Sequence, residues 1–256
     1  MKKNKMMRIA SVLLVAVILT TCAISGTFAK YVTKDDASET ARVAKFGVTV
    51  TAAGSLYGED YVKADNNTPG SVNLTVESSE DDKKVVAPGT KSADDGMTFA
   101  VTGKPEVKVK VTVAVADTMK DVYLKEKTDL PDMTTGNTFN NTEDYYPVKY
   151  TLIQTTTGGT TNLVTDGKLS EVKTKLELLT AEYGANTELN DVIGTLKLTW
   201  KWDFDDSGAG TYDKQDTLLG NLAADPALAA AISLTEGTDF NLNSSIGISF
   251  TVTQID

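Results

Sequence analysis

The sequence contains no histidine, and its single cysteine, Cys22, lies within the first 29 residues. This shortage excludes a Ser-His-Asp triad, an HExxH zinc site, a zinc cluster and any disulfide within one chain. Catalysis would have to rely on carboxylates, lysine, tyrosine or serine. We therefore predict that the protein is not an enzyme and has no cofactor apart from the calcium alternative described below. The remaining enzymatic alternative is a carboxylate-based hydrolase, which needs two acidic side chains converging in one cleft.

Positive charge is also scarce. The 256 residues include 25 Lys and Arg against 35 Asp and Glu, giving a formal net charge of −10. Four of the basic residues lie in the first eight positions, and their removal lowers the net charge to −14. An acidic surface repels phosphate backbones and anionic lipid. We therefore predict no nucleic-acid partner and, after processing, no membrane partner.

The N-terminus has the three-part pattern of a secretory signal peptide. Basic residues occupy positions 1–8, an apolar run covers 9–24, and the small residues of 25–29 end at Ala29. The apolar run is short for a bilayer span, although an uncleaved anchor is the alternative. We predict a signal peptide over 1–29, cleavage between Ala29 and Lys30, and secretion to the cell surface or extracellular matrix.

Beyond the signal, apolar residues alternate with Lys, Thr and Ser. The runs with one apolar parity include 46–50, 97–101, 107–115, 146–152, 196–202 and 246–252. Period-two alternation indicates antiparallel strands with one buried and one solvated face. We predict an all-β fold of two antiparallel sheets packed face to face over 43–256, preceded by an extended segment over 30–42.

Two regions interrupt this alternation. Leu169, Val172, Leu176 and Leu179 have helical spacing, and Asp225-Pro226 is a typical helix start. We predict short helical insertions near 165–190 and 215–235. The stretches 78–96 and 127–144 are rich in Asp, Ser, Gly, Asn and Thr, which favours long surface loops.

Two local patterns suggest ligand sites. Asp203, Asp205 and Ser207, followed by Gly208, resemble the first half of a calcium-binding loop. Position 12 of that loop is Lys214 rather than Glu, so an acidic turn and an opportunistic calcium site remain open. Trp200 and Trp202 share one parity and could stack on a sugar, but their parity matches that of Leu196 and Leu198, which favours the core.

The stretches Gly26-Thr27-Phe28-Ala29-Lys30-Tyr31 and Ala44-Lys45-Phe46-Gly47-Val48 resemble the start of the TasA/camelysin family. Those are secreted proteins of Gram-positive bacteria whose signal peptides are cut by the SipW peptidase. The resemblance implies a jelly-roll-like β-sandwich and a SipW-type signal peptidase as a partner during export. It also implies a fibre subunit of the cell surface or biofilm matrix. Camelysins carry a metalloprotease label, which the lack of histidine contradicts here.

The new N-terminus suggests how such fibres would assemble. Tyr31, Val32 and Thr33 are strand formers at the tip of an otherwise polar segment. We predict that this segment adds as a strand to the sandwich of another copy or of a related secreted subunit. The alternative is a monomeric surface adhesin or glycan-binding module.

Overall fold

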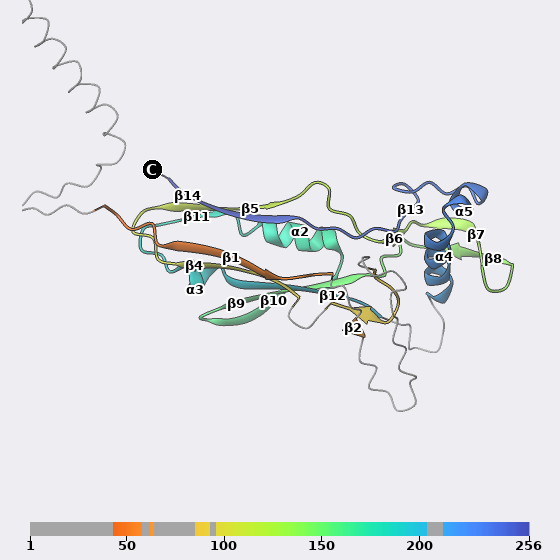
Figure 1. Cartoon of the computed structure of the whole chain (residues 1–256), viewed down its shortest axis with the longest axis horizontal. Helices are drawn as coiled ribbons and strands as arrows, with labels where there is room; N and C mark the ends of the chain where they lie inside the picture. The colour runs from red at the N-terminus through yellow and green to blue at the C-terminus, as the bar shows by residue number, and fades with distance from the viewer. Residues whose placement is uncertain (1–42, 58–61, 64–84, 93–95, 204–211, 256) are drawn as a thin grey trace, which may run out of the picture. The chain divides into compact units, whose positions relative to one another are not determined.

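The computed structural model describes residues 43–57, 62–63, 85–92, 96–203 and 212–255. It divides the chain into two compact units, Met1–Ala44 and Lys45–Asp256. Every described helix and strand belongs to the second unit (Figure 1). Antiparallel sheets dominate that unit and its helices are short, so the fold is all-β and sandwich-like, as predicted.

The larger sheet is organised around β12 (Gly194–Trp202). On one side β12 pairs with β9 (Lys149–Thr156). On the other side it pairs with β4 (Met97–Gly103) and then, at its last two residues, with β3 (Thr90–Lys91). β3 lies within the stretch 78–96, which the sequence predicted to be a surface loop, so that prediction is wrong at Thr90–Lys91. Residues 78–84 and 93–95 of the stretch lie outside the described residues.

Three further strands extend this sheet outward. β1 (Val48–Gly54) lies beside β4, β10 (Gly159–Gly167) beside β9, and β2 (Val62–Lys63) beside β3. β1 and β10 are therefore the two long edges of the sheet.

The alternation within β12 explains its central place. Leu196, Leu198, Trp200 and Trp202 are all buried, whereas Lys197 and Lys201 are half-exposed on the opposite face. One face of the sheet is thus apolar and turned inward, as the period-two pattern predicted.

The smaller sheet has three strands. β5 (Val109–Val115) lies between β11 (Ala181–Tyr183) and β14 (Ile248–Gln254). Four valines of β5 point inward and are buried, and Lys110 between them is exposed. The two sheets share one core, in which the rings of Phe99 and Phe250 lie 5.4 Å apart between centroids.

Helix α2 (Leu169–Glu177) closes one side of this sandwich. It contacts β5 of the smaller sheet and β9 and β10 of the larger one, and it buries Leu169, Val172 and Leu176 (Figure 1). The helical insertion predicted near 165–190 therefore exists. It also contains β11 and ends with the single turn α3 (Leu189–Val192).

The second helical insertion consists of α4 (Asp213–Ala224) and α5 (Pro226–Ala231). The Asp225 carboxylate accepts a hydrogen bond from the Ala227 N–H at 3.0 Å and so caps α5, as predicted. α4 packs through Leu218, Leu219 and Leu222.

The prediction of a surface loop over 127–144 is wrong. This stretch forms a hairpin of β7 (Lys127–Pro131) and β8 (Thr138–Asn141). The side chain of Asp132 stabilises the turn, accepting hydrogen bonds from the Thr134 N–H at 3.0 Å and the Thr135 N–H at 3.3 Å. Two short strands, β6 (Tyr123–Leu124) and β13 (Phe240–Asn241), pair next to this hairpin region.

Both ends of the second unit meet the connection between β4 and β5. The Glu106 N–H donates to the Lys45 carbonyl at 2.9 Å, and the Ile255 N–H donates to the Lys108 carbonyl at 3.0 Å. The first and last described residues of the sandwich are therefore held at the same end of it.

Candidate functional site

The inner face of the sandwich is incompletely covered along β1. Val50 of β1 pairs directly with Val101 of β4, and directly paired residues point to the same face of a sheet. Val101 is 1% exposed, but Val50 is 41% exposed. The apolar face therefore continues onto the edge strand, where β14 of the facing sheet contacts β1 but leaves Val50 partly uncovered.

β14 has the same character in the facing sheet. Ile248, Phe250 and Val252 share the parity of the buried β5 valines, yet all three are only half-buried against the core. α2 covers the opposite side of the sandwich, where it joins β5 to β9 and β10. The β1 and β14 edges thus form the less protected side.

These two edge strands also lack the features that usually prevent an edge strand from pairing with another chain. Natural edge strands are commonly interrupted by charge, proline or a bulge. β1 and β14 each run for seven residues without a charged residue or proline. By contrast, β10 pairs with β9 through two register shifts, and β11 is only three residues long. Chemically, the β1 and β14 edges are suited to accept an added strand.

The residues predicted to provide that strand lie outside the described part of the chain. This applies to the cleavage site, Ala29 and Lys30, and to the donor segment, Tyr31, Val32 and Thr33. Their predicted roles stay predictions.

The predicted calcium loop is described only at its first residue. Asp203 is exposed, and its carboxylate forms an ion pair with Lys201 at 3.0 Å. Asp205 and Ser207 lie outside the described residues. Within the described ranges, no group of three or more Asp, Glu, Cys or His side chains is arranged to hold a metal ion. The calcium prediction therefore rests on sequence alone.

The tryptophan pair belongs to the core. Trp200 and Trp202 are each 5% exposed, and the Trp200 indole N–H donates to the Leu56 carbonyl at 2.6 Å. A sugar-stacking platform needs an exposed ring face, so these side chains do not provide one.

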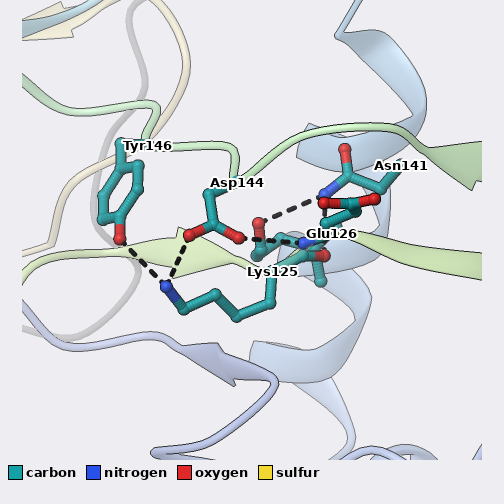
Figure 2. Close-up of polar contacts among 6 residues, drawn as sticks. Lys125, Glu126, Asn141, Asp144 and Tyr146 are labelled. Carbon is teal, nitrogen blue, oxygen red and sulfur yellow. Dashed lines mark hydrogen bonds and ion pairs between the residues drawn. The ribbon is translucent and has the colours of Figure 1, made fainter.

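A polar network that the sequence did not reveal joins the connection between β6 and β7 to the end of β8 and to the segment that leads to β9 (Figure 2). The Lys125 ammonium donates to the Asp144 carboxylate at 2.6 Å and to the Tyr146 hydroxyl at 3.2 Å. The Glu126 N–H donates to the other Asp144 oxygen at 3.1 Å. The Asn141 amide donates to the carbonyls of Leu124 and Lys125.

The charges of this network indicate a stabilising electrostatic contact between chain segments rather than a reactive centre. Hydrogen bonding from Lys125 lowers the pKa of Asp144, and the bond to Asp144 raises the pKa of Lys125. Both groups therefore stay charged at neutral pH. A protonated amine is not a nucleophile, so the pair is unsuited to amide formation or other chemistry at the carboxyl carbon.

Tyrosine rings and further lysines surround the same network. The rings of Tyr123 and Tyr146 lie 5.9 Å apart between centroids and are tilted by 46°. The Lys168 ammonium lies 4.3 Å from the Tyr146 ring centroid, a cation–π distance. Both tyrosines are half-exposed, so this surface combines accessible aromatic rings with positive charge.

A second polar cluster is largely enclosed near the start of α2. The hydroxyls of Tyr57 and Tyr150 lie 3.1 Å apart, and both contact the Ser244 hydroxyl. Asp121 lies nearby and accepts a hydrogen bond from the Leu169 N–H at 3.1 Å, while its other oxygen has no partner. Burial raises the pKa of Asp121 to about 6.

Comparison with known proteins identifies no relative. No family model, no curated protein and no solved structure matches this chain. Among the described helices, none has the length and apolar character needed to cross a membrane.

Proposed function

We propose that the protein is a secreted structural subunit that assembles into fibres at the cell surface or in the biofilm matrix. The observation that supports this proposal is the unprotected side of the sandwich, where β1 and β14 present uncharged edges and Val50 is 41% exposed on the inner face. An apolar inner face that is only partly covered, beside two edge strands that pair with no further strand among the described residues, favours intermolecular strand addition.

The segment containing Tyr31, Val32 and Thr33 of a neighbouring copy is the proposed occupant. An added strand gains main-chain hydrogen bonds with the edge and covers half-buried side chains such as Phe250. The contact is head-to-tail and does not close on itself, so it propagates as a filament. Removal of residues 1–29 by a SipW-type signal peptidase would free the segment only after export, which couples processing to assembly.

The experiment compares secreted chains that begin at Lys30 and at Thr40, incubated at equal concentration and viewed by electron microscopy. Only the longer chain is expected to form fibres, and Tyr31→Asp should abolish them without lowering the melting temperature. Equal polymerisation of both chains, or of neither, contradicts the proposed donor segment.

The accepting edge is tested by a matched pair on β1. Val50→Lys places a charge on the exposed inner face, whereas Thr51→Lys places the same charge on the outer face of the same strand. We expect Val50→Lys to block fibre growth and Thr51→Lys to permit it. The reverse order would show that the inner face at β1 is not the acceptor.

The second candidate function is a monomeric surface adhesin or glycan-binding module. The half-exposed Tyr123–Tyr146 pair, with lysines around it, is the observation that favours it. A protein that stays monomeric in the first experiment but binds sugars would fit this candidate.

A further inference from the structure

β14 is the long edge strand of the smaller sheet. It runs beside β5 over all seven of its residues, and within the described ranges no other strand pairs with it (Figure 1). Residues 240–255, which include β14, contain no charged residue, whereas charged residues make up 23% of the chain. On a protein with a net charge of −10, two copies can therefore meet along this edge without placing like charges in contact.

The hydrogen bonds to β5 determine which backbone groups of β14 face outward. The Ala116 N–H donates to the Gly247 carbonyl at 2.8 Å, and at the other end the Ile255 N–H donates to the Lys108 carbonyl at 3.0 Å. Backbone groups alternate in direction along an antiparallel strand, so the odd-numbered residues of β14 bond to β5. The even-numbered residues direct their N–H and C=O groups to the free edge; they are Ile248, Phe250, Val252 and Gln254.

The side chains make this edge complementary to itself. The even-numbered apolar residues of β14 are half-buried against the core, and the hydroxyl residues between them are exposed on the outer face. Two antiparallel β14 strands related by a two-fold axis at Phe250 match on both faces. Ile248 then lies opposite Val252 of the second copy on the inner face, and Ser249 lies opposite Thr251 of the second copy on the outer face. In this register the outward backbone groups of the even-numbered residues bond to each other.

We propose that β14 pairs with β14 of a second copy of this chain, so that two three-stranded sheets become one continuous sheet in a closed two-fold dimer. The segment containing residues 31–33 fits this edge less well, because charged residues follow at 34–36, whereas β14 offers seven uncharged residues. The dimer uses β14 and leaves β1 to that segment, so it does not depend on the proposed fibres.

Paired charges test the contact and its register. Ser249→Lys combined with Thr251→Lys places like charges opposite each other in the dimer, whereas Ser249→Lys combined with Thr251→Glu places opposite charges there. Sedimentation of chains that begin at Thr40, which lack residues 31–33, measures dimerisation. We expect the unmodified chain to dimerise, and the Lys–Glu variant to dimerise at least tenfold more tightly than the Lys–Lys variant.

The control for charge is contained in this pair of variants. The Lys–Lys variant has the smaller net negative charge, so general repulsion between copies would favour the reverse order. Both substituted side chains are exposed, so equal melting temperatures should show that both variants fold. An unmodified chain that stays monomeric, or equal dimerisation of the two variants, overturns the proposal. A dimer that forms only when residues 30–39 are present also overturns it, because the occupant of β14 is then the leading segment.

Disulfide cross-linking locates the strands in chains that begin at Lys30, which contain no native cysteine. In the proposed register the Cα atoms of Ser249 and of Thr251 in the second copy lie about 4.5 Å apart, within disulfide range, whereas the two Ser249 residues lie about 7–8 Å apart. A mixture of Ser249→Cys and Thr251→Cys chains should therefore yield several times more covalent dimer than either chain alone. Equal yields contradict the register. Fibres without this cross-link refute the dimer alone, and the cross-link without fibres refutes the proposed function alone.

Discussion

Trp200 and Trp202 are two residues apart and equally buried, but their indole N–H groups are in different situations. That of Trp200 donates to the Leu56 carbonyl, whereas that of Trp202 lies near the Tyr145 hydroxyl without a partner of normal hydrogen-bond geometry. Removing one partner of a buried hydrogen bond lowers the free energy of unfolding by about 1–3 kcal/mol, because the other polar group then stays buried without a partner.

We therefore expect Trp200→Phe to lower the free energy of unfolding by about 1–3 kcal/mol more than Trp202→Phe does. Both substitutions lose the same volume, so the second serves as the control for packing. Urea unfolding of the two variants measures the difference. Equal losses would mean that the bond to Leu56 contributes no net stability.

The buried Asp121 carboxyl should make the stability of the protein depend on pH in an unusual direction. Its pKa is raised to about 6 because burial disfavours the charged form, and Lys149 and Lys168 offset this only in part. The folded state therefore binds the proton more tightly than the unfolded state does. Stability gained from this group is fully present below pH 4, declines as the pH rises, and is lost above about pH 6.

Asp121→Asn removes this titration while keeping an oxygen to accept the Leu169 N–H. The variant should exceed the natural protein in stability at pH 7, on the order of 2 kcal/mol, and the advantage should shrink towards pH 4. Thermal unfolding across this range measures it. A constant difference between the two proteins at all pH values would contradict the assignment.

At the scale of elements, the junction of α3 and β12 depends on a glycine. Gly194 has a φ of +62°, and a Cβ built there would lie 2.1 Å from the Thr155 carbonyl oxygen of the neighbouring strand. Gly136, in the turn between β7 and β8, has a φ of +73° but open space around it.

We expect Gly194→Ala to destabilise the protein by at least 3 kcal/mol, since β9 and β12 would have to separate locally, and Gly136→Ala by about 1–2 kcal/mol from backbone strain alone. Thermal unfolding of the two variants measures the difference. Similar losses of stability in both would show that the close approach at Gly194 is relieved by small shifts of the backbone.

The same elements show what the sequence could and could not predict. The strands of the core were predictable because buried Val, Leu and Trp alternate with Lys and Thr, as in β5 and β12. The β7–β8 hairpin was missed because its residues are mostly Thr, Asn and Asp, and within its two strands only Leu130 and Asn141 are buried. The Lys125–Asp144 network was missed because its members are 19 residues apart and join only through the fold.

At the scale of the whole molecule, charge opposes the proposed assembly. With residues 1–29 removed, as proposed, the chain would carry a net charge of −14 at neutral pH, so copies would repel each other at low ionic strength. The proposed contact at β1 and β14 is itself uncharged. Salt shortens the screening length from about 30 Å at 0.01 M to about 8 Å at 0.15 M.

Fibre growth of the chain beginning at Lys30 should therefore be faster at 0.15 M than at 0.01 M salt. Light scattering at equal protein concentration follows the growth. Slower growth in salt would indicate that attractive ion pairs, rather than strand addition at uncharged edges, hold the copies together.

The meeting of residues 45 and 255 at the β4–β5 connection makes the sandwich suitable for circular permutation. Closely spaced chain ends can be joined by a short linker, and an exposed turn can be opened in exchange. The turn at Gly158 and Gly159, between β9 and β10, is exposed, and a Cβ there would meet little. A permuted chain that omits residues 30–42 would keep every described strand of the sandwich but would lack the proposed donor segment. It would therefore accept an added strand without being able to donate one.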